Sequence, residues 1–275
     1  MCQVLKVSRS AFYKWLDQGP SKRELEVLLL KEKIKETFSK SRSTYGHRRV
    51  KKELKKQGIS SSNNRIRRLM KELNLVPIQT RKYKATTNSK HSLPVAPNLL
   101  NKDFKADAPC RKWVGDISYL STEEGWLYLA TIIDLFSRKV VGWALGDRMT
   151  KQLVIDAMNQ ALQHERPSKG LIFHSDRGSQ YASYDYQDLL RSYGIRQSMS
   201  AKGDCYDNAC AESFFATLKK ECIYRKRFKT RSQAKLVAID HIIWYNSQRM
   251  HSYLDDMSPL EFERKYYQGL LSLAA

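Results

Sequence analysis

The feature that most constrains the fold is a charged residue inside an apolar strand. Asp116 lies within the segment 113–120, whose aromatic and β-branched content predicts a strand. A carboxylate flanked by Val114, Ile117 and Leu120 is costly to bury unless something offsets its charge, as a divalent metal ion would. The chain must therefore bring compensating chemistry to the middle of this strand.

Two further acids lie in the second half of the chain. Asp176 belongs to the segment 174–181 and comes directly after the apolar run 171–173, so it sits where a buried strand meets a loop. After 35 intervening residues comes Glu212, within the segment 207–219. That segment is typical of a helix for which Asp207 is the N-cap, with Ala211, Phe214 and Leu218 on one packed apolar face. A second face carries Asn208, Glu212 and Lys219.

These three acids have the chemistry of a magnesium site. Carboxylates are hard oxygen ligands, and two Mg²⁺ ions about 3.5–4 Å apart can activate a nucleophile and stabilise a leaving oxygen in phosphoryl transfer. Spacing alone is weak evidence, because the chain has 28 acidic residues and most carboxylates are solvated or paired. The stronger indication is that each acid sits inside a longer apolar or turn pattern, and that these patterns occur in one order.

Five ordered segments resemble the integrase core of bacterial insertion-sequence transposases. The similarity extends over nearly the whole chain and is greatest to the second-reading-frame (orfB) product of the insertion-sequence-three family. The segments are 113–119, 134–138, 174–181, 207–219 and 245–251. The resemblance implies a ribonuclease H-like fold and an Asp-Asp-Glu triad, matched here by Asp116, Asp176 and Glu212.

The resemblance also implies further roles. Asp116 would bridge the two Mg²⁺ ions, for which Mn²⁺ would substitute. Lys219 matches a basic residue seven positions after the family's glutamate and would contact a phosphate near the cleaved end, unless it is simply a solvated helix lysine. Asn208 would orient Glu212 or touch DNA, although helix capping explains it nearly as well. The first-reading-frame (orfA) product would be a partner, and the chain would act on DNA as a homo-multimer.

The strand and helix patterns predict an α/β fold with a mixed five-stranded sheet. Three antiparallel strands come first, with Asp116 on the central strand, and alternating helices and strands follow. The predicted strands are 112–120, 126–133, 139–145, 171–174 and 195–199, and the predicted helices are 151–163 and 184–192.

Positive charge is concentrated before the predicted sheet. Residues 1–100 contain 24 Lys and Arg against 7 Asp and Glu, a net charge of +17, whereas residues 101–275 contain 25 against 21, a net charge of +4. Such an excess favours a polyanion as partner, and DNA before a membrane, because no basic amphipathic helix with a clean apolar face is present. A helix over 22–38, a helix that Gly58 ends and a helix with Ile66, Leu69, Met70 and Leu73 on one face predict a small all-α, helix-turn-helix-like domain.

Candidate DNA-binding residues follow from this pattern. They lie near the second predicted helix and on the third, and in a basic run after Glu212: Arg48, Arg49, Arg65, Arg67, Arg68, Arg225 and Arg227. A charged helix face is more often merely solvated, but the one-sided sign here favours DNA. Residues 1–16 predict either the end of a helix-turn-helix or a plain amphipathic helix, capped by Ser8 and packed through Phe12, Trp15 and Leu16.

The remaining segments complete the predicted organisation. A last helix over 233–249 would place Leu236, Ile239, Ile243 and Trp244 inward, with Arg249 near flanking DNA. Residues 98–101 and Phe104 would dock on the edge of the core. The predicted subdivision is a partial helix-turn-helix (1–20), a helical DNA-binding domain (21–76), a basic linker (77–110), the catalytic core (111–265) and a tail (266–275).

Other residues have simpler interpretations. His174 is interpreted as a satisfied core histidine, and Asp134, Asp204 and Asp207 as caps or turn formers. The five cysteines form no Cys-x-x-Cys pair, so they indicate reduced thiols; Cys205 and Cys210 lack partners for a zinc site. No apolar run approaches 18 residues and no secretory signal is visible, so we expect a cytoplasmic, nucleoid-associated protein without membrane contact.

The favoured function is Mg²⁺-dependent cleavage and strand transfer at the ends of an insertion sequence. The DNA substrates would be the element's terminal inverted repeats and the target duplex. Two alternatives remain at this point. One is a ribonuclease H-like nuclease that cuts without joining, and the other is a DNA-binding regulator whose core has lost activity.

Overall fold

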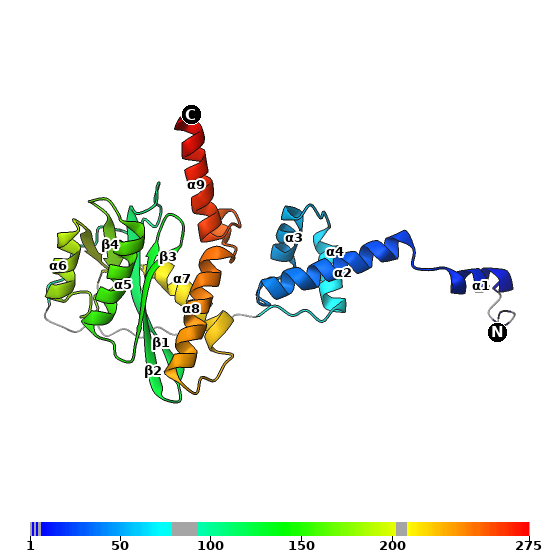
Figure 1. Cartoon of the computed structure of the whole chain (residues 1–275), viewed down its shortest axis with the longest axis horizontal. Helices are drawn as coiled ribbons and strands as arrows, with labels where there is room; N and C mark the ends of the chain where they lie inside the picture. The colour runs from blue at the N-terminus through cyan, green and yellow to red at the C-terminus, as the bar shows by residue number, and fades with distance from the viewer. Residues whose placement is uncertain (1, 3, 5–6, 79–92, 202–207, 275) are drawn as a thin grey trace. The chain divides into compact units, whose positions relative to one another are not determined.

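The computed structural model describes residues 2, 4, 7–78, 93–201 and 208–274, and divides the chain into two compact units (Figure 1). The first unit comprises residues 1–78 and the second residues 79–275. Each is described by itself. The finer boundaries predicted from the sequence stay predictions. Within the described ranges, no helix is both long and apolar enough to cross a membrane.

The first unit is all helical. It contains α1 (Arg9–Asp17), α2 (Lys22–Lys40), α3 (His47–Lys56) and α4 (Asn63–Glu72). Helix α2 begins with a capping box in which Ser21 and Glu24 satisfy each other's backbone N–H groups. Helices α2, α3 and α4 pack on one another around a buried apolar set, which includes Ile34, Val50, Leu54, Ile66, Leu69 and Met70. The predicted three-helix pattern is therefore confirmed.

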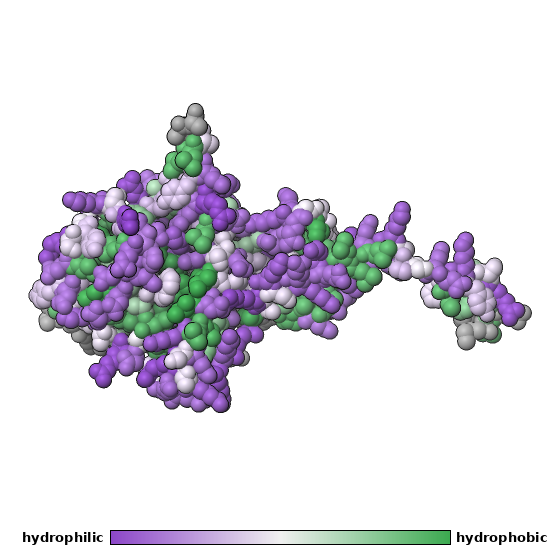
Figure 2. All heavy atoms as spheres, viewed as in Figure 1, coloured by the Kyte–Doolittle hydropathy of each residue, from purple (hydrophilic) through white to green (hydrophobic). Residues whose placement is uncertain are grey.

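Helix α1 differs from its prediction. Ser8 accepts a hydrogen bond from the Ala11 N–H, so the predicted cap is confirmed. The prediction that Phe12, Trp15 and Leu16 pack is wrong, because α1 buries none of its residues and Trp15 is 69% exposed. Helix α2 also exposes apolar side chains in its first half, where Leu25, Leu28 and Leu29 lie at the surface (Figure 2).

The second unit is built on a five-stranded mixed sheet. Its strands are β1 (Lys112–Thr122), β2 (Gly125–Asp134), β3 (Val140–Gly146), β4 (Ile172–Ser175) and β5 (Arg196–Met199). The order across the sheet is β3-β2-β1-β4-β5, with antiparallel β1–β2 and β2–β3 pairs and parallel β1–β4 and β4–β5 pairs. This topology confirms the predicted sheet and places Asp116 on the central strand β1.

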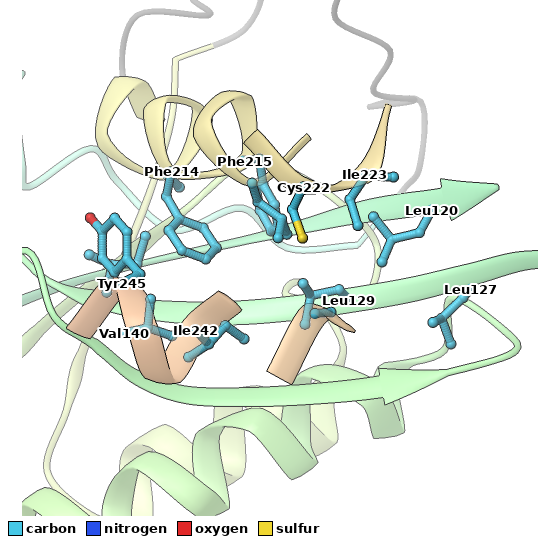
Figure 3. Packing of buried hydrophobic residues seen from close by; sticks show 14 of the residues in the cluster. Leu120, Leu127, Leu129, Val140, Phe214, Phe215, Cys222, Ile223, Ile242 and Tyr245 are labelled. Carbon is cyan, nitrogen blue, oxygen red and sulfur yellow. The ribbon is translucent and has the colours of Figure 1, made fainter. Parts of the chain in front are cut away.

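Helices cover both faces of this sheet. On one face lie α5 (Lys151–Glu165) and α6 (Tyr184–Ser192), packed with an apolar cluster that includes Trp113 and Phe173. On the other lie α7 (Ala209–Leu218), the π-helical turn η2 (Lys219–Ile223) and α8 (Arg231–Ser247). Figure 3 shows this second layer, in which aromatic and aliphatic side chains of the helices meet those of the strands: Phe214, Phe215, Ile242 and Tyr245 against Leu120, Leu129 and Val140.

Helix α8 uses a different face from the one predicted. Leu236 is 70% exposed and Ile243 is also at the surface, so the prediction that they point inward is wrong, whereas Trp244 is buried as predicted. The buried face is formed by two alanines, three residues with rings and one isoleucine: Ala234, Ala238, His241, Ile242, Trp244 and Tyr245. At Ala234 and Ala238 the small side chains let the helix backbone approach its neighbours closely.

The ends of the core are also ordered. Residues 97–100 lie along β5, because the Leu99 and Leu100 N–H groups donate to the Ser198 hydroxyl at 2.9 and 3.3 Å. Since β5 is an edge strand, the predicted docking of this segment is confirmed. Beyond α8, the chain forms the 3₁₀ turn η3 (Ser252–Leu254) and α9 (Pro259–Ala274), which continues through the predicted tail.

Candidate active site

The parallel pairing of β1 with β4 places Asp116 beside Asp176. Val114 is paired with His174, and each aspartate lies two residues beyond its member of this pair. Parallel strands run in the same direction, so Asp116 and Asp176 lie equally far beyond this pair and toward the same edge of the sheet. Asp176 follows the last residue of β4, and its carboxylate accepts a hydrogen bond from the Gly178 N–H at 2.9 Å.

Helix α7 brings Glu212 to the same part of the sheet. The pairing of β1 with β4 stops at Val114, and α7 packs on β1. The first contact is made by Asn208, whose side-chain amide donates to the carbonyl oxygen of Gly115 at 3.1 Å. Glu212 lies one turn further along the helix, in its first-turn region, where a carboxylate interacts favourably with the helix dipole.

The charges of the other two acids act on Asp116. Burial raises the pKa of Asp116 well above its usual value, and the negative charges of Asp176 and Glu212 raise it further. The Ile117 N–H, which donates to Asp116 at 2.8 Å, and the positive charge of Lys219 act in the opposite direction. The pKa of Glu212 is raised by partial burial.

Tyr181 lies near both aspartates. Burial raises its pKa, and the charges of Asp116 and Asp176 raise it further. Its hydroxyl oxygen would lie 3.4 Å from a Cβ atom built on Gly115, the residue before Asp116. The buried Tyr181 thus lies next to two half-buried aspartates, one in the middle of β1 and one directly after β4.

The three carboxylates suit a divalent cation, although in the described part of the chain they do not form a complete coordination shell. All three acids offer carboxylate oxygens, and their mutual repulsion would be relieved by a cation. Within the part of the chain that the structure describes, no three His, Cys, Asp or Glu side chains are placed to share one ion. The geometry thus gathers the acids around Asp116 without closing them into a three-ligand site.

Lys219 is buried beside these acids. It is 3% exposed, and its Nζ atom lies 4.7 Å from the centre of the Tyr119 ring. Burial lowers the pKa of Lys219, whereas the charge of Asp116 raises it. The interpretation as a solvated helix lysine is therefore wrong. The predicted phosphate contact stays a prediction, and in this structure the ammonium group acts as a counter-charge inside the site.

Asn208 precedes α7 but does not cap it. Its side chain makes no capping hydrogen bond, so that alternative is wrong, and it is buried with its amide on Gly115. A direct contact of Asn208 with DNA stays a prediction. Asp204, Cys205 and Asp207, for which turn, zinc and capping roles were weighed, lie outside the described residues.

The arginines predicted to bind DNA occupy two separate units. In the first unit, Arg48, Arg67 and Arg68 are exposed, whereas Arg49 and Arg65 are half-buried. Arg49 lies over the Tyr45 ring at 5.6 Å, and Arg68 is 3.6 Å from Glu72. In the second unit, the exposed pair is Arg225 and Arg227. Their contacts with DNA stay predictions.

Arg249 has a structural role instead of the predicted DNA contact. It is buried, and its guanidinium group donates from Nη2 to the Glu221 carboxylate at 2.8 Å and from Nε at 3.0 Å. The neighbouring Asn246 side chain pairs with both the N–H and the carbonyl oxygen of Val140 at 2.9 Å. The closing segment of the resemblance therefore holds α8 to the sheet and to η2.

Two polar core residues satisfy their hydrogen bonds locally. His174 is fully buried, with Nδ1 at 2.8 Å from the Ser198 hydroxyl and Nε2 at 3.2 Å from the Ser200 hydroxyl, which confirms the predicted core histidine. Asp134 accepts from the N–H of Phe136 at 2.7 Å, as expected of a turn former. It also accepts from the indole N–H of Trp113 at 3.0 Å, a contact that the sequence pattern did not predict.

Arg138 was not recognised from the sequence beyond its place in a turn. Its guanidinium group donates to the Cys210 sulfur at 2.7 Å and to the Phe104 carbonyl at 3.1 Å. It also stacks on Tyr253 at 4.1 Å from the ring centre. These partners are remote in sequence, so no local pattern signals the role. Arg138 ties the segment before β1 to the start of α7, two residues from Glu212.

Comparison with known proteins gives three family matches. An HTH-like domain matches residues 24–83, and integrase core domains match residues 106–205 and 193–259. Two solved structures are similar to parts of this chain. One is an intasome of simian T-cell lymphotropic virus in complex with the PP2A regulatory subunit B56 gamma, with a TM-score of 0.49, 19% identity and coverage of 78% of this chain and 70% of that chain. The other is the HTLV-2 integrase catalytic core domain in complex with magnesium, with a TM-score of 0.45, 18% identity and coverage of 58% and 99%.

Proteins that align over nearly their whole length have a much higher sequence identity to this chain. An insertion element IS600 uncharacterized 31 kDa protein from Shigella sonnei is 50% identical over 269 residues, covering 98% of this chain and 99% of that protein. The transposase InsF for insertion sequence IS3A from Escherichia coli (strain K12) is 42% identical over 268 residues, covering 96% and 93%. Identity at this level over nearly the whole of both chains shows that this protein belongs to the IS3 family of insertion-sequence transposases, and is a DNA transposase with a DDE-type integrase core.

Proposed function

We propose that Asp116, Asp176 and Glu212 are the catalytic triad of this transposase and hold two Mg²⁺ ions, which Mn²⁺ can replace. The observation that supports this proposal best is the electrostatic environment of Asp116, whose pKa is raised by burial and by both other acids. Such a concentration of like charge is unfavourable in a resting protein, and it is typical of sites that receive a cation.

Each residue has a distinct task in the proposed reaction. Asp116 and Asp176 are fixed on neighbouring parallel strands and position the scissile phosphodiester, while Glu212 approaches from α7. When bound, the metal ions would supply Lewis-acid stabilisation of the attacking and leaving oxygens. Water attacks in line to free a 3′-hydroxyl, and that hydroxyl then attacks a second phosphodiester. Lys219 stabilises the ionised form of Asp116.

The partners of the reaction are DNA ends and a target duplex. DNA is the substrate of the family, and the positive charge of the first 100 residues, a net +17 from 24 Lys and Arg against 7 Asp and Glu, supports binding of the element's terminal inverted repeats there. Two ends must be handled together, so we propose that the chain works as a homo-multimer on DNA. We further propose that the orfA product contributes DNA binding, and that the protein acts in the cytoplasm at the nucleoid.

The decisive experiment compares Asp176→Asn with a matched surface variant. Asp188→Asn is the control, because Asp188 is an exposed acid on α6 that pairs with Arg191. Nicking of an end-containing duplex is measured with Mg²⁺, with Mn²⁺ and with EDTA. We expect no cleavage from Asp176→Asn, normal cleavage from Asp188→Asn and none in EDTA. Equal activity of the two variants would disprove the catalytic assignment.

A second measurement separates the transposase reaction from simple hydrolysis. A substrate that already carries the free 3′-hydroxyl is offered together with a target duplex. A transposase joins the two, whereas a nuclease that cuts without joining does not. Joined product that disappears in Asp116→Asn and Glu212→Gln would support a shared site for both steps. Absence of joined product with the wild-type chain, in the presence of the orfA product, would favour the nuclease.

A further inference from the structure

A group of exposed aromatic side chains lies at the β1–β2 hairpin. Trp126 is 49% exposed at the start of β2, and its ring meets the edge of Tyr119 on β1 in a T-shaped contact with 4.8 Å between ring centres. Tyr224, which follows η2, is 60% exposed. Tyr224 is linked to Tyr119 through Lys219, whose carbonyl oxygen accepts from the Tyr224 N–H at 2.9 Å and whose Nζ atom lies 4.7 Å from the centre of the Tyr119 ring. Exposed rings scattered singly need no explanation, but here two of them lie at one hairpin.

Basic side chains lie directly beside these rings. Four exposed residues follow Tyr224, and none of them makes an ion pair within the described ranges: Arg225, Lys226, Arg227 and Lys229. Arg231 at the start of α8 makes a fifth cation, whereas the hairpin contributes two acids, Glu123 and Glu124. Five cations against two acids leave an excess of three positive charges on this surface.

Hydrogen bonds fix the hairpin to the basic segment. The Glu123 N–H donates to the Phe228 carbonyl at 3.0 Å, and the Glu124 carboxylate accepts from the Arg231 N–H at 2.7 Å. The Arg231 Nε atom also donates to the carbonyl of Trp126 at 3.1 Å. The aromatic and the cationic side chains therefore belong to one preformed surface, which we call the hairpin surface.

The hairpin surface is connected to the proposed catalytic acids. The Lys219 ammonium group lies over the inner face of Tyr119 and interacts with Asp116. The π-helical turn η2 begins at Lys219 and ends just before Tyr224, with the Tyr224 N–H donating to the Lys219 carbonyl at 2.9 Å. This short turn thus begins at Lys219, beside the acids, and is followed by exposed residues, from Tyr224 to Arg227. π-Helical turns of this kind occur frequently at functional sites.

We propose that the hairpin surface binds unpaired DNA next to the cleaved phosphodiester, with bases stacked on Trp126 and Tyr224 and phosphates held by the cations of residues 225–229. Aromatic rings beside basic side chains are the combination that single-stranded nucleic acid uses, because an unpaired base exposes its ring face. Base pairs inside a duplex hide these faces. The position next to the acids rests on the proposed catalytic site, whereas the stacking itself does not.

Binding is tested with the full-length chain in EDTA, so that no cleavage interferes. A fluorescein-labelled thymidine oligonucleotide and a duplex of the same length are titrated at moderate and at raised salt, since salt weakens phosphate contacts of the basic first unit more than stacking. Trp126→Ala and Tyr224→Ala are compared with the wild-type chain. The conservative rescue is Trp126→Phe, and the matched control is Tyr193→Ala, which removes an aromatic ring of similar exposure after α6.

We expect Trp126→Ala and Tyr224→Ala each to weaken oligonucleotide binding about 5- to 150-fold at raised salt, the range for loss of one base stack. Duplex binding and the Tyr193→Ala variant should be unchanged, and Trp126→Phe should restore most of the affinity. Unchanged oligonucleotide binding, or an equal loss for the duplex, would overturn the proposal.

A second measurement needs no variant and covers the case in which a substitution disturbs folding. An oligonucleotide containing 5-iododeoxyuridine is irradiated with the wild-type chain, and the crosslinked peptides are identified by mass spectrometry. Crosslinks at Trp126 or Tyr224 support the stacking site, and crosslinks found only in the first unit refute it. The outcome is independent of catalysis, because Asp176→Asn should give the same crosslinks even if it proves fully active.

Discussion

The buried pair of Arg249 and Glu221 makes a quantitative test of the core. Their side chains are 8% and 13% exposed, and three hydrogen-bond contacts join them at 2.8, 3.0 and 3.2 Å. Removing one partner of such a pair leaves an uncompensated charge in a poorly solvated place, at a cost of about 3–5 kcal/mol. An exposed pair contributes no more than about 1 kcal/mol. We therefore expect Arg249→Met to destabilise the core several times more than Arg191→Met, which breaks the exposed pair with Asp188.

The assay is urea unfolding followed by tryptophan fluorescence, since Trp113 and Trp244 are buried in the core. Glu221→Gln should match Arg249→Met, and the double variant should cost less than the sum, because neither charge then remains unpaired. The alternative role of Arg249, a contact with a DNA phosphate, is tested by the salt dependence of duplex binding. A phosphate contact by Arg249 would lower the slope of log K against log salt by about 0.9 when removed. A lowered slope together with a loss of stability under about 1 kcal/mol would refute the structural assignment.

Three further predictions concern packing and pH. Gly115→Ala should destabilise the core by about 1–3 kcal/mol in urea unfolding, since its Cβ would lie 2.5 Å from the ring of the buried Phe173; a neutral result would mean that the ring can move. Burial raises the pKa of Asp134 from 3.8 to about 6, so folding favours its protonated form and stability should fall by roughly 2 kcal/mol as the pH rises from 4 to 6. Asp134→Asn should abolish this part of the fall, and an identical pH profile would contradict it. Leu236→Gln should change the free energy of unfolding by less than about 0.5 kcal/mol. Ala238→Leu should lower it by about 1–3 kcal/mol through overpacking. The reverse order of these two effects would mean that Leu236, as predicted from the sequence, lies on the buried face of α8.

The sheet was predictable because its signals are local. Apolar and β-branched runs marked each strand to within a few residues, and the turn residues between them fixed the antiparallel order. The acids were recognisable for the same reason: Asp116 interrupts one such run and Asp176 follows another. Their proximity, in contrast, depends on the β1–β4 pairing, which no local pattern signals and which only the resemblance implied.

The incorrect predictions have a different cause, because they depend on which residues pack against a given side chain in the folded protein. Hydrophobicity alone favoured Leu236 as a core residue of α8, but the buried face of the helix runs through Ala234 and Ala238 and leaves Leu236 at the surface. Charge alone made Arg249 a candidate for DNA contact, although its partner Glu221 lies 28 residues earlier in the chain. Arg138 likewise meets Cys210 and Phe104 from far away in sequence. Pair contacts of this kind carry no periodic signal.

The register between β1 and β4 limits how the chain can change in length. Inserting one residue between Val114 and Asp116 would turn the carboxylate to the opposite side of the sheet, because successive strand residues alternate sides. An insertion between His174 and Asp176 would likewise move the second acid away from the first. The connection at 166–170 has no such restriction, since added length there leaves both strands in place. Natural variation in size should therefore gather in such connections, while the number of residues from the Val114–His174 pair to each aspartate stays constant.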